Sequence, residues 1–136
     1  EAQYHALIGE TGNSPAAIAG ALALAQVDTE HWLAAGLAPT LNVLVQGADI
    51  YEPLGRGDGV NVVRFAGPDD LLVSGQMWRE NRVRLAFKPA VMVNGLGRGQ
   101  LIAFTQDPTV RGYLEGLKPL LINAVFLGPA RSSPNW

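Results

Sequence analysis

The chain has 136 residues, 48% hydrophobic and 16% charged, a composition typical of one globular domain rather than of a disordered segment. It contains no cysteine, which excludes a disulfide framework, a thiolate metal site and a cysteine nucleophile but leaves the cellular compartment open. No apolar run approaches the roughly 20 residues that a membrane-spanning helix needs.

The formal net charge of −2 is unevenly distributed. Residues 1–70 hold nine acidic and two basic residues, giving −7, whereas residues 71–136 hold three acidic and eight basic residues, giving +5. We expect the two halves to be neighbours in the fold, because their fields then partly cancel. The basic residues are dispersed and are not interleaved with aromatic residues, which argues against a nucleic-acid partner.

The first quarter of the chain predicts an N-terminal arm and a helix, together residues 1–27. Residues 1–13 predict a short edge strand or an irregular arm that ends in a Gly-rich turn. Ser14 and Pro15 combine a capping residue with a proline at the first helical position, so we expect a helix that continues to about residue 26. Because the chain begins at Glu1 without Met or a basic leader, we also expect a processed or excised segment.

The middle of the chain alternates between strand and turn patterns. Residues 28–36 predict a capped turn, and residues 49–59 a loop crowded with Gly, Asp and Pro. Strands are predicted over 40–46 and 60–66, with a short apolar piece over 71–73. A helix is predicted over 76–86, with three side chains facing inward: Met77, Trp78 and Leu85.

Two apolar runs, 89–94 and 99–105, flank a short Gly-rich link, which predicts an antiparallel hairpin. Within the second run, residues 101–104 have the length and bulk of a buried strand, on which we expect the other apolar segments to pack. Asp107 and Pro108 follow, as a helix cap and a first helical residue.

The segment after Pro108 predicts a helix as far as Phe126, in two pieces, because Gly112, Gly116 and Pro119 disfavour one unbroken rod. Apolar residues at helical spacing predict a face on the sheet: Leu117, Leu120, Leu121, Ala124, Val125 and Leu127. The sequence therefore predicts an α/β fold with a mixed β-sheet and flanking helices. We expect one domain over 1–136, with its core at 28–130 and a loose tail at 131–136.

The residues that could carry catalysis or bind a metal each have a structural interpretation. His5 and His31 are far apart in the sequence and belong to no His-x-x-Glu motif, so we predict no metal site and interpret His31 as a turn residue. The Gly-rich segment 95–99 precedes a strand rather than a helix, which favours a hairpin turn over a phosphate loop. Ser74 lacks a nucleophile elbow and a positioned His–acid pair.

Two further features also have ordinary explanations. The tripeptide Arg56-Gly57-Asp58 matches an integrin recognition motif, but such a triplet arises easily by chance in a Gly-rich loop. Asn123 lies in an apolar helical segment, where we expect its amide to be satisfied by hydrogen bonds in the core. We therefore predict no catalytic residue.

The best candidate for ligand binding is Asp107, because it follows a predicted strand at the end where α/β proteins place ligands. Thr105 precedes it, and Arg111 and Arg98 are included as candidates for the same region. The capping role of Asp107 already accounts for this residue. Binding of a small ligand or peptide near Asp107 is therefore the alternative hypothesis.

Five stretches, in matching order and spacing, resemble the C-terminal region of bacterial zinc carboxypeptidase-like proteins of the carboxypeptidase A type. They are residues 28–37, 65–75, 88–93, 104–108 with Arg111, and 123–130, within an overall range of 28–130. The resemblance implies a class I glutamine-amidotransferase-like, flavodoxin-like domain that follows a peptidase domain. The first βα units of such a domain are not recognisable in residues 1–27, so we expect an incomplete chain with an exposed sheet edge open to self-association.

The resemblance implies an architecture and no catalytic residue, because this chain has neither the zinc signature nor the cysteine nucleophile of those proteins. It implies no cofactor here, with zinc only in the peptidase domain of the parent protein. We therefore expect a non-catalytic accessory domain of a periplasmic or secreted protein. It would pack against the peptidase domain or regulate access to it, with no nucleic-acid or membrane partner.

Overall fold

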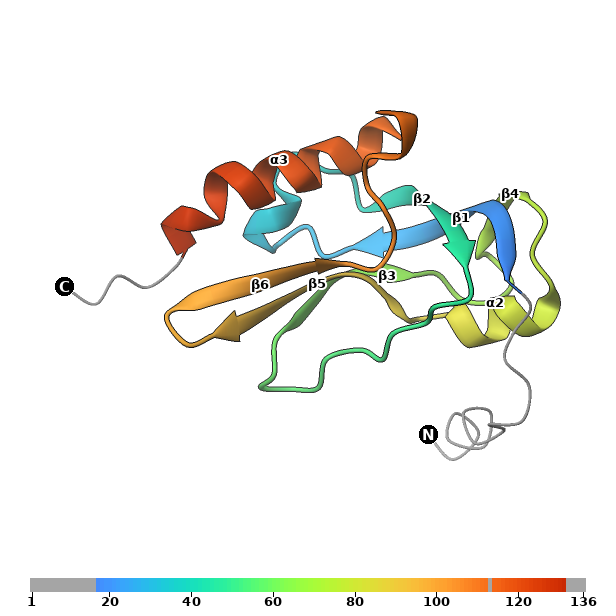
Figure 1. The fold of residues 1–136 in the computed structure, drawn as a ribbon, viewed down its shortest axis with the longest axis horizontal. Helices are drawn as coiled ribbons and strands as arrows, with labels where there is room; N and C mark the ends of the chain where they lie inside the picture. The colour runs from blue at the N-terminus through green and yellow to red at the C-terminus, as the bar shows by residue number, and fades with distance from the viewer. Residues whose placement is uncertain (1–16, 113, 132–136) are drawn as a thin grey trace.

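The structure is a computed structural model that describes residues 17–112 and 114–131, with the side chain of Arg111 left out. The arm predicted over 1–13 and nearly all of the tail predicted over 131–136 lie outside the described residues. Figure 1 shows a curled sheet with α3 across one side and α2 near one end.

Six strands form one sheet in the order β2-β1-β3-β5-β6, with β4 also paired to β1 (Figure 1). Their bounds are β1 (Ile18–Val27), β2 (Thr40–Gly47), β3 (Val60–Phe65), β4 (Leu72–Gly75), β5 (Pro89–Leu96) and β6 (Gly99–Phe104). All pairings between these described strands are antiparallel, so the prediction of a mixed sheet is wrong. The coarser prediction, a sheet flanked by helices, is confirmed.

The helix predicted up to residue 26 is wrong, because residues 18–27 form β1. Along β1 the side chains alternate between the two faces of the sheet, and Ala21, Ala23 and Ala25 are buried. Each of these alanines faces a larger residue on β2: Val45, Val43 and Leu41. This packing of small against large side chains outweighs the preference of alanine for helices.

Two strands, β3 and β4, pair with the same edge of β1. β3 pairs with Ala25, Gln26 and Val27, and β4 pairs with residues 21–23. Between them, Ala66 N donates to Leu24 O over 2.9 Å, and Leu24 N donates to Leu71 O over 2.8 Å. β3 and β4 therefore lie end to end along β1.

The helices are α2 (Arg79–Leu85) and α3 (Lys118–Leu127), with short 3-10 turns η1 (Trp32–Ala34), η2 (Val110–Gly112), η3 (Glu115–Leu117) and η4 (Pro129–Arg131). Met77 and Leu85 are buried as predicted, but Trp78 is 61% exposed. Trp78 has extended backbone angles at the start of α2, so its side chain does not follow helical spacing. In the segment after Asp107, two 3-10 turns replace the first predicted helical piece.

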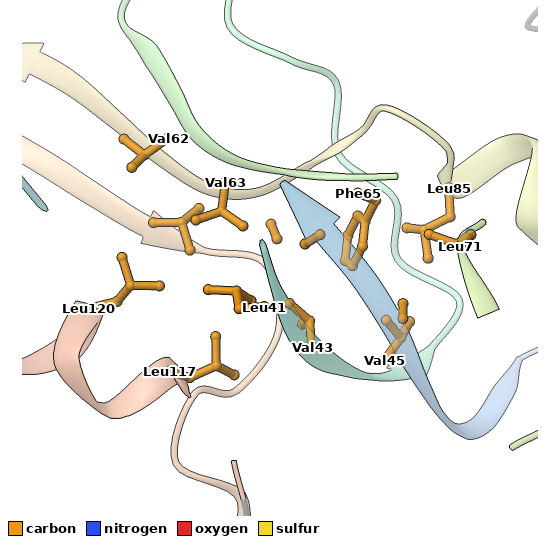
Figure 2. Packing of buried hydrophobic residues seen from close by; sticks show 14 of the residues in the cluster. Leu41, Val43, Val45, Val62, Val63, Phe65, Leu71, Leu85, Leu117 and Leu120 are labelled. Atoms are coloured by element: carbon orange, nitrogen blue, oxygen red, sulfur yellow. The ribbon is translucent and has the colours of Figure 1, made fainter. Parts of the chain in front are cut away.

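The core is one contiguous cluster of apolar side chains. Figure 2 shows Leu117 and Leu120 beside Leu41 and Val43, while Phe65 lies toward the end of the cluster that holds Leu71, Leu85 and Val45. The predicted buried strand at 101–104 is not central: β6 pairs only with β5, and Leu101 is 55% exposed. β1, which contacts three other strands, holds the central place instead.

Candidate functional site

Thr105 directly follows β6 and is hydrogen-bonded to the neighbouring strand, β5. Its Oγ1 donates to the carbonyl of Pro89 over 3.1 Å, with Ala90 O at 3.3 Å. Thr105 N also donates to Ala90 O over 3.0 Å. The hydroxyl that was a candidate for ligand binding therefore already serves to fasten β6 to β5.

Asp107 is exposed and caps the turn that leads to η2. Its Oδ1 accepts hydrogen bonds from Thr109 N over 2.7 Å and from Thr109 Oγ1 over 2.6 Å. These two hydrogen bonds stabilise the carboxylate and lower the pKa of Asp107 below its ordinary value of 3.8. The capping role is thus present, although the turn that follows is 3-10 rather than α-helical.

The fold does not gather all four candidate ligand residues. Thr105, Asp107 and the backbone of Arg111 follow one another after β6, whereas Arg98 lies in the hairpin turn before it. At roughly 3.3 Å per residue, the length of β6 puts about 20 Å between Arg98 and Thr105.

A groove of about 560 Å³ opens beside η2. It is lined by residues of β1, β2, β4 and η2: Gly20, Ala21, Leu22, Leu44, Gln46, Ser74, Gly75 and Val110. Gln106 Oε1 accepts a hydrogen bond from Gln46 N over 3.0 Å and so ties the segment after β6 to β2. None of these described lining residues is a histidine or a charged residue, so the groove offers shape, amide and hydroxyl groups but no acid–base pair.

His31 caps η1, as the interpretation of a turn residue predicted. Its Nδ1 accepts a hydrogen bond from Leu33 N over 3.2 Å, and its ring centroid lies 5.4 Å from that of Trp32. Burial lowers the pKa of His31 below 6.5; the nearby Asp28 carboxylate opposes this shift and Arg131 adds to it. Arg131 also lies over the Trp32 ring at 5.9 Å.

Asn123 fixes α3 on η1. Its Nδ2 donates to Leu33 O over 2.9 Å and to Ala35 O over 3.0 Å. This confirms the prediction of a satisfied amide.

Lys88 was missed by the sequence analysis. Its side chain is buried, and Nζ lies 2.6 and 2.7 Å from the two carboxylate oxygens of Glu52. Asn61 pairs with both backbone groups of Leu54, at 3.0 Å each. Both contacts fix the loop over 48–59, which indicates a structural role for Lys88. The only signal in the sequence is a lysine at the start of an apolar strand.

The outer face of α3 exposes large apolar side chains to solvent. We use this name for Ile122, Val125 and Phe126, which are 53%, 60% and 75% exposed. Lys118 is the only charged residue of α3, and Leu120 is buried on the opposite side. The prediction that Val125 and Leu127 lie on the sheet is wrong, because both are exposed.

Within the described residues, no group of three His, Cys, Asp or Glu side chains is close enough together to hold a metal ion. No helix in this part of the chain has the length and apolar character needed to cross a membrane. Comparison with family models, curated proteins and solved structures finds no match to this chain.

Proposed function

We propose that this chain is a non-catalytic accessory domain of a zinc carboxypeptidase-like protein, which packs against the peptidase domain through the outer face of α3. The parent protein is inferred from the five stretches that resemble the C-terminal region of such proteins. The amidotransferase-like, flavodoxin-like architecture that the same resemblance implies has a mostly parallel sheet, so it is not part of this proposal, because all pairings between the described strands are antiparallel. The structural observation that carries the docking role is the apolar character of α3 on both of its sides.

A helix at the surface of a globular protein normally has one apolar face and one polar face, whereas a helix that is apolar all round is normally buried. In α3, Leu120 packs on the sheet while Ile122, Val125 and Phe126 face away from it. Exposed apolar side chains grouped on one face of a helix are typical of protein–protein contacts. A second protein surface over α3 would bury both sides of the helix.

The state of the polar candidates supports a role without catalysis. Thr105 fastens two strands, Asp107 caps a turn and His31 caps η1. Each of these groups therefore already has a structural role, which accounts for its presence without a substrate.

The test uses the peptidase domain of the parent protein, produced separately and titrated with this chain by calorimetry. We expect saturable binding, weakened at least about tenfold by Phe126→Glu, because burying one large apolar side chain contributes roughly 1.5–3 kcal/mol. Trp78→Glu is the matched control, since Trp78 is an exposed aromatic residue away from α3. Equal binding by wild type and Phe126→Glu would exclude this docking face. Peptide hydrolysis by the chain alone that a chelator abolishes would contradict the non-catalytic assignment.

The groove beside η2 favours a second candidate function, binding of a small polar ligand or a peptide. Its volume of about 560 Å³ lies in the range of roughly 300–1,000 Å³ that is typical of ligand sites. Val110, which lines it, lies three residues after Asp107. A thermal-shift screen with short peptides and small polar compounds tests this function. A ligand that stabilises the wild type but not Asp107→Ala supports it, and a flat screen opposes it.

A further inference from the structure

We propose that β6 pairs with β6 of a second copy of this chain, antiparallel and about a two-fold axis at Ile102, so that the two sheets become continuous. This goes beyond the proposed docking function and uses a different surface, the edge of the sheet rather than the outer face of α3. Two properties of β6 support this pairing: the backbone N–H and C=O groups that point away from β5, and the way these groups pair with the same groups of a second copy.

β6 and β2 are the two ends of the main strand order. The β2 end is partly covered, because Gln106 accepts a hydrogen bond from Gln46 N and η3 lies against β2. On the β6 side, no described strand pairs beyond β6. Gln100 Nε2 donates to Gly128 O over 2.8 Å, so the residue after α3 contacts β6, but this contact uses the side chain of Gln100 and not the backbone of the edge. A strand edge without a partner strand is a template for pairing with another chain.

The register of the hairpin fixes which groups point outward. A two-residue turn makes the closing pair, Leu96 and Gly99, exchange hydrogen bonds, and every second pair after it does the same. The hydrogen bond from Thr105 N to Ala90 O fits this alternation. The backbone N–H and C=O groups that point away from β5 are therefore those of Gln100, Ile102 and Phe104.

In an antiparallel pairing, these three residues of one copy can pair with the same three residues of the second copy. With the two-fold axis at Ile102, that residue meets Ile102 of the second copy, and Gln100 meets Phe104 of the second copy. Every pair then exchanges two backbone hydrogen bonds. A shift by two residues in either direction leaves one outward-pointing residue without its counterpart, so the strand itself selects this register.

The charges agree with a second copy as the partner. We call the contact between the two β6 strands the joint. No residue of β6 is charged, so no like charges meet along it. The same register places Arg98 of one copy beside Gln106 of the other, one residue from the exposed Asp107. Arg98 and Asp107 lie at opposite ends of β6 in one chain, and the two-fold axis puts the end that carries Arg98 next to the end of the second copy that carries Asp107, at both ends of the joint.

The sheet face next to the joint adds apolar contact. In this register Leu101, which is 55% exposed, stands opposite Ala103 of the second copy on the same face. Cross-strand apolar pairs of this kind stabilise antiparallel sheets. The joint therefore combines backbone hydrogen bonds, an apolar pair and opposite charges, all supplied by one sequence.

The first test measures the molar mass of the full 136-residue chain by light scattering and sedimentation over a range of concentrations. We expect the mass to rise toward twice the 14.4 kDa of the monomer. Ile102→Pro removes an N–H that the joint uses and the hairpin ladder does not, and proline is tolerated on strand edges. It should weaken the dimer at least about tenfold. Ile102→Val is the matched control and should leave the dimer intact.

A charge exchange provides a second test that does not depend on how the proline variant folds. Arg98→Glu places like charges together twice and should weaken the dimer, whereas Arg98→Glu combined with Asp107→Arg should restore it. The amides of Gln100, Ile102 and Phe104 should exchange with solvent more slowly as protein concentration rises.

A wild-type chain that stays monomeric at all concentrations would overturn the pairing, as would a dimer that neither Ile102→Pro nor Arg98→Glu weakens. Phe126→Glu should leave the dimer unchanged, so failure of the docking proposal and failure of this one give different results.

Discussion

His31 makes the described fold sensitive to pH through a single ring nitrogen. Protonation of Nδ1 would remove the acceptor for Leu33 N, and burial disfavours the charged ring. Because the pKa of His31 is lower in the folded chain than in the unfolded chain, the unfolded chain binds more protons as the pH falls below 6.5. The stability contributed by neutral His31 is therefore present above this pH and is lost as the pH falls toward the folded pKa.

We expect the melting temperature of the wild type to fall as the pH decreases from about 8 to about 5, across the range in which histidine titrates. His31→Asn should flatten this dependence, because asparagine can cap η1 without titrating. His5→Gln, which removes the other histidine, is the control and should keep the wild-type slope. The same slope in His31→Asn would show that other groups cause the pH dependence.

At the residue scale, the sequence predicted those polar roles that depend on near neighbours. His31 and Asp107 each accept a hydrogen bond from a residue two positions later, so the local pattern was sufficient. Lys88 and Glu52 are 36 positions apart in the sequence. They meet only because of the tertiary fold, which local sequence patterns do not reveal. For the same reason the sequence did not place Arg98 at the far end of β6 from Asp107.

At the scale of elements, α3 and η1 are joined by one side chain. Asn123→Asp keeps the size of the residue but replaces the donor with a carboxylate facing two carbonyl oxygens. We expect a loss of about 1–3 kcal/mol in the free energy of unfolding, measured by urea denaturation. Asn42→Asp, at an exposed position of β2, is the control and should change this free energy by less than about 0.5 kcal/mol. Equal effects of the two changes would contradict a coupling of α3 to η1 through Asn123.

Elements with a clear period were predictable. The strands over 40–46 and 60–66 and the hairpin were confirmed, because alternation and a Gly-rich link determine them locally. β1 was missed, since its apolar residues lie on both faces and alanine also favours helices. α3 has apolar residues on both of its sides, so spacing did not reveal which side packs on the sheet. The edge position of β6 depends on topology rather than on composition.

At the scale of the whole molecule, the two oppositely charged halves are interleaved in one sheet. β1, β2 and β3 come from the acidic half, and β4, β5 and β6 from the basic half. β3 pairs with β5 across this division, and Lys88 joins Glu52 across it as well. Apart from the β5–β6 hairpin, the antiparallel direction of the strand pairs was not predictable, because an apolar run has the same composition in either direction.

The shared side of β1 imposes an order on the fold as the chain leaves the ribosome. β2 can form a hairpin with β1 as soon as it is synthesised. The other edge of β1 stays unpaired until β3 pairs with one half of it and β4, which is synthesised later, pairs with the other half. Gly75 permits that last step: a side-chain carbon there would lie 3.0 Å from Ala21 Cα and from Gly20 O. A bulkier residue at this one position would prevent β4 from pairing with β1, even after β2 and β3 had paired with it.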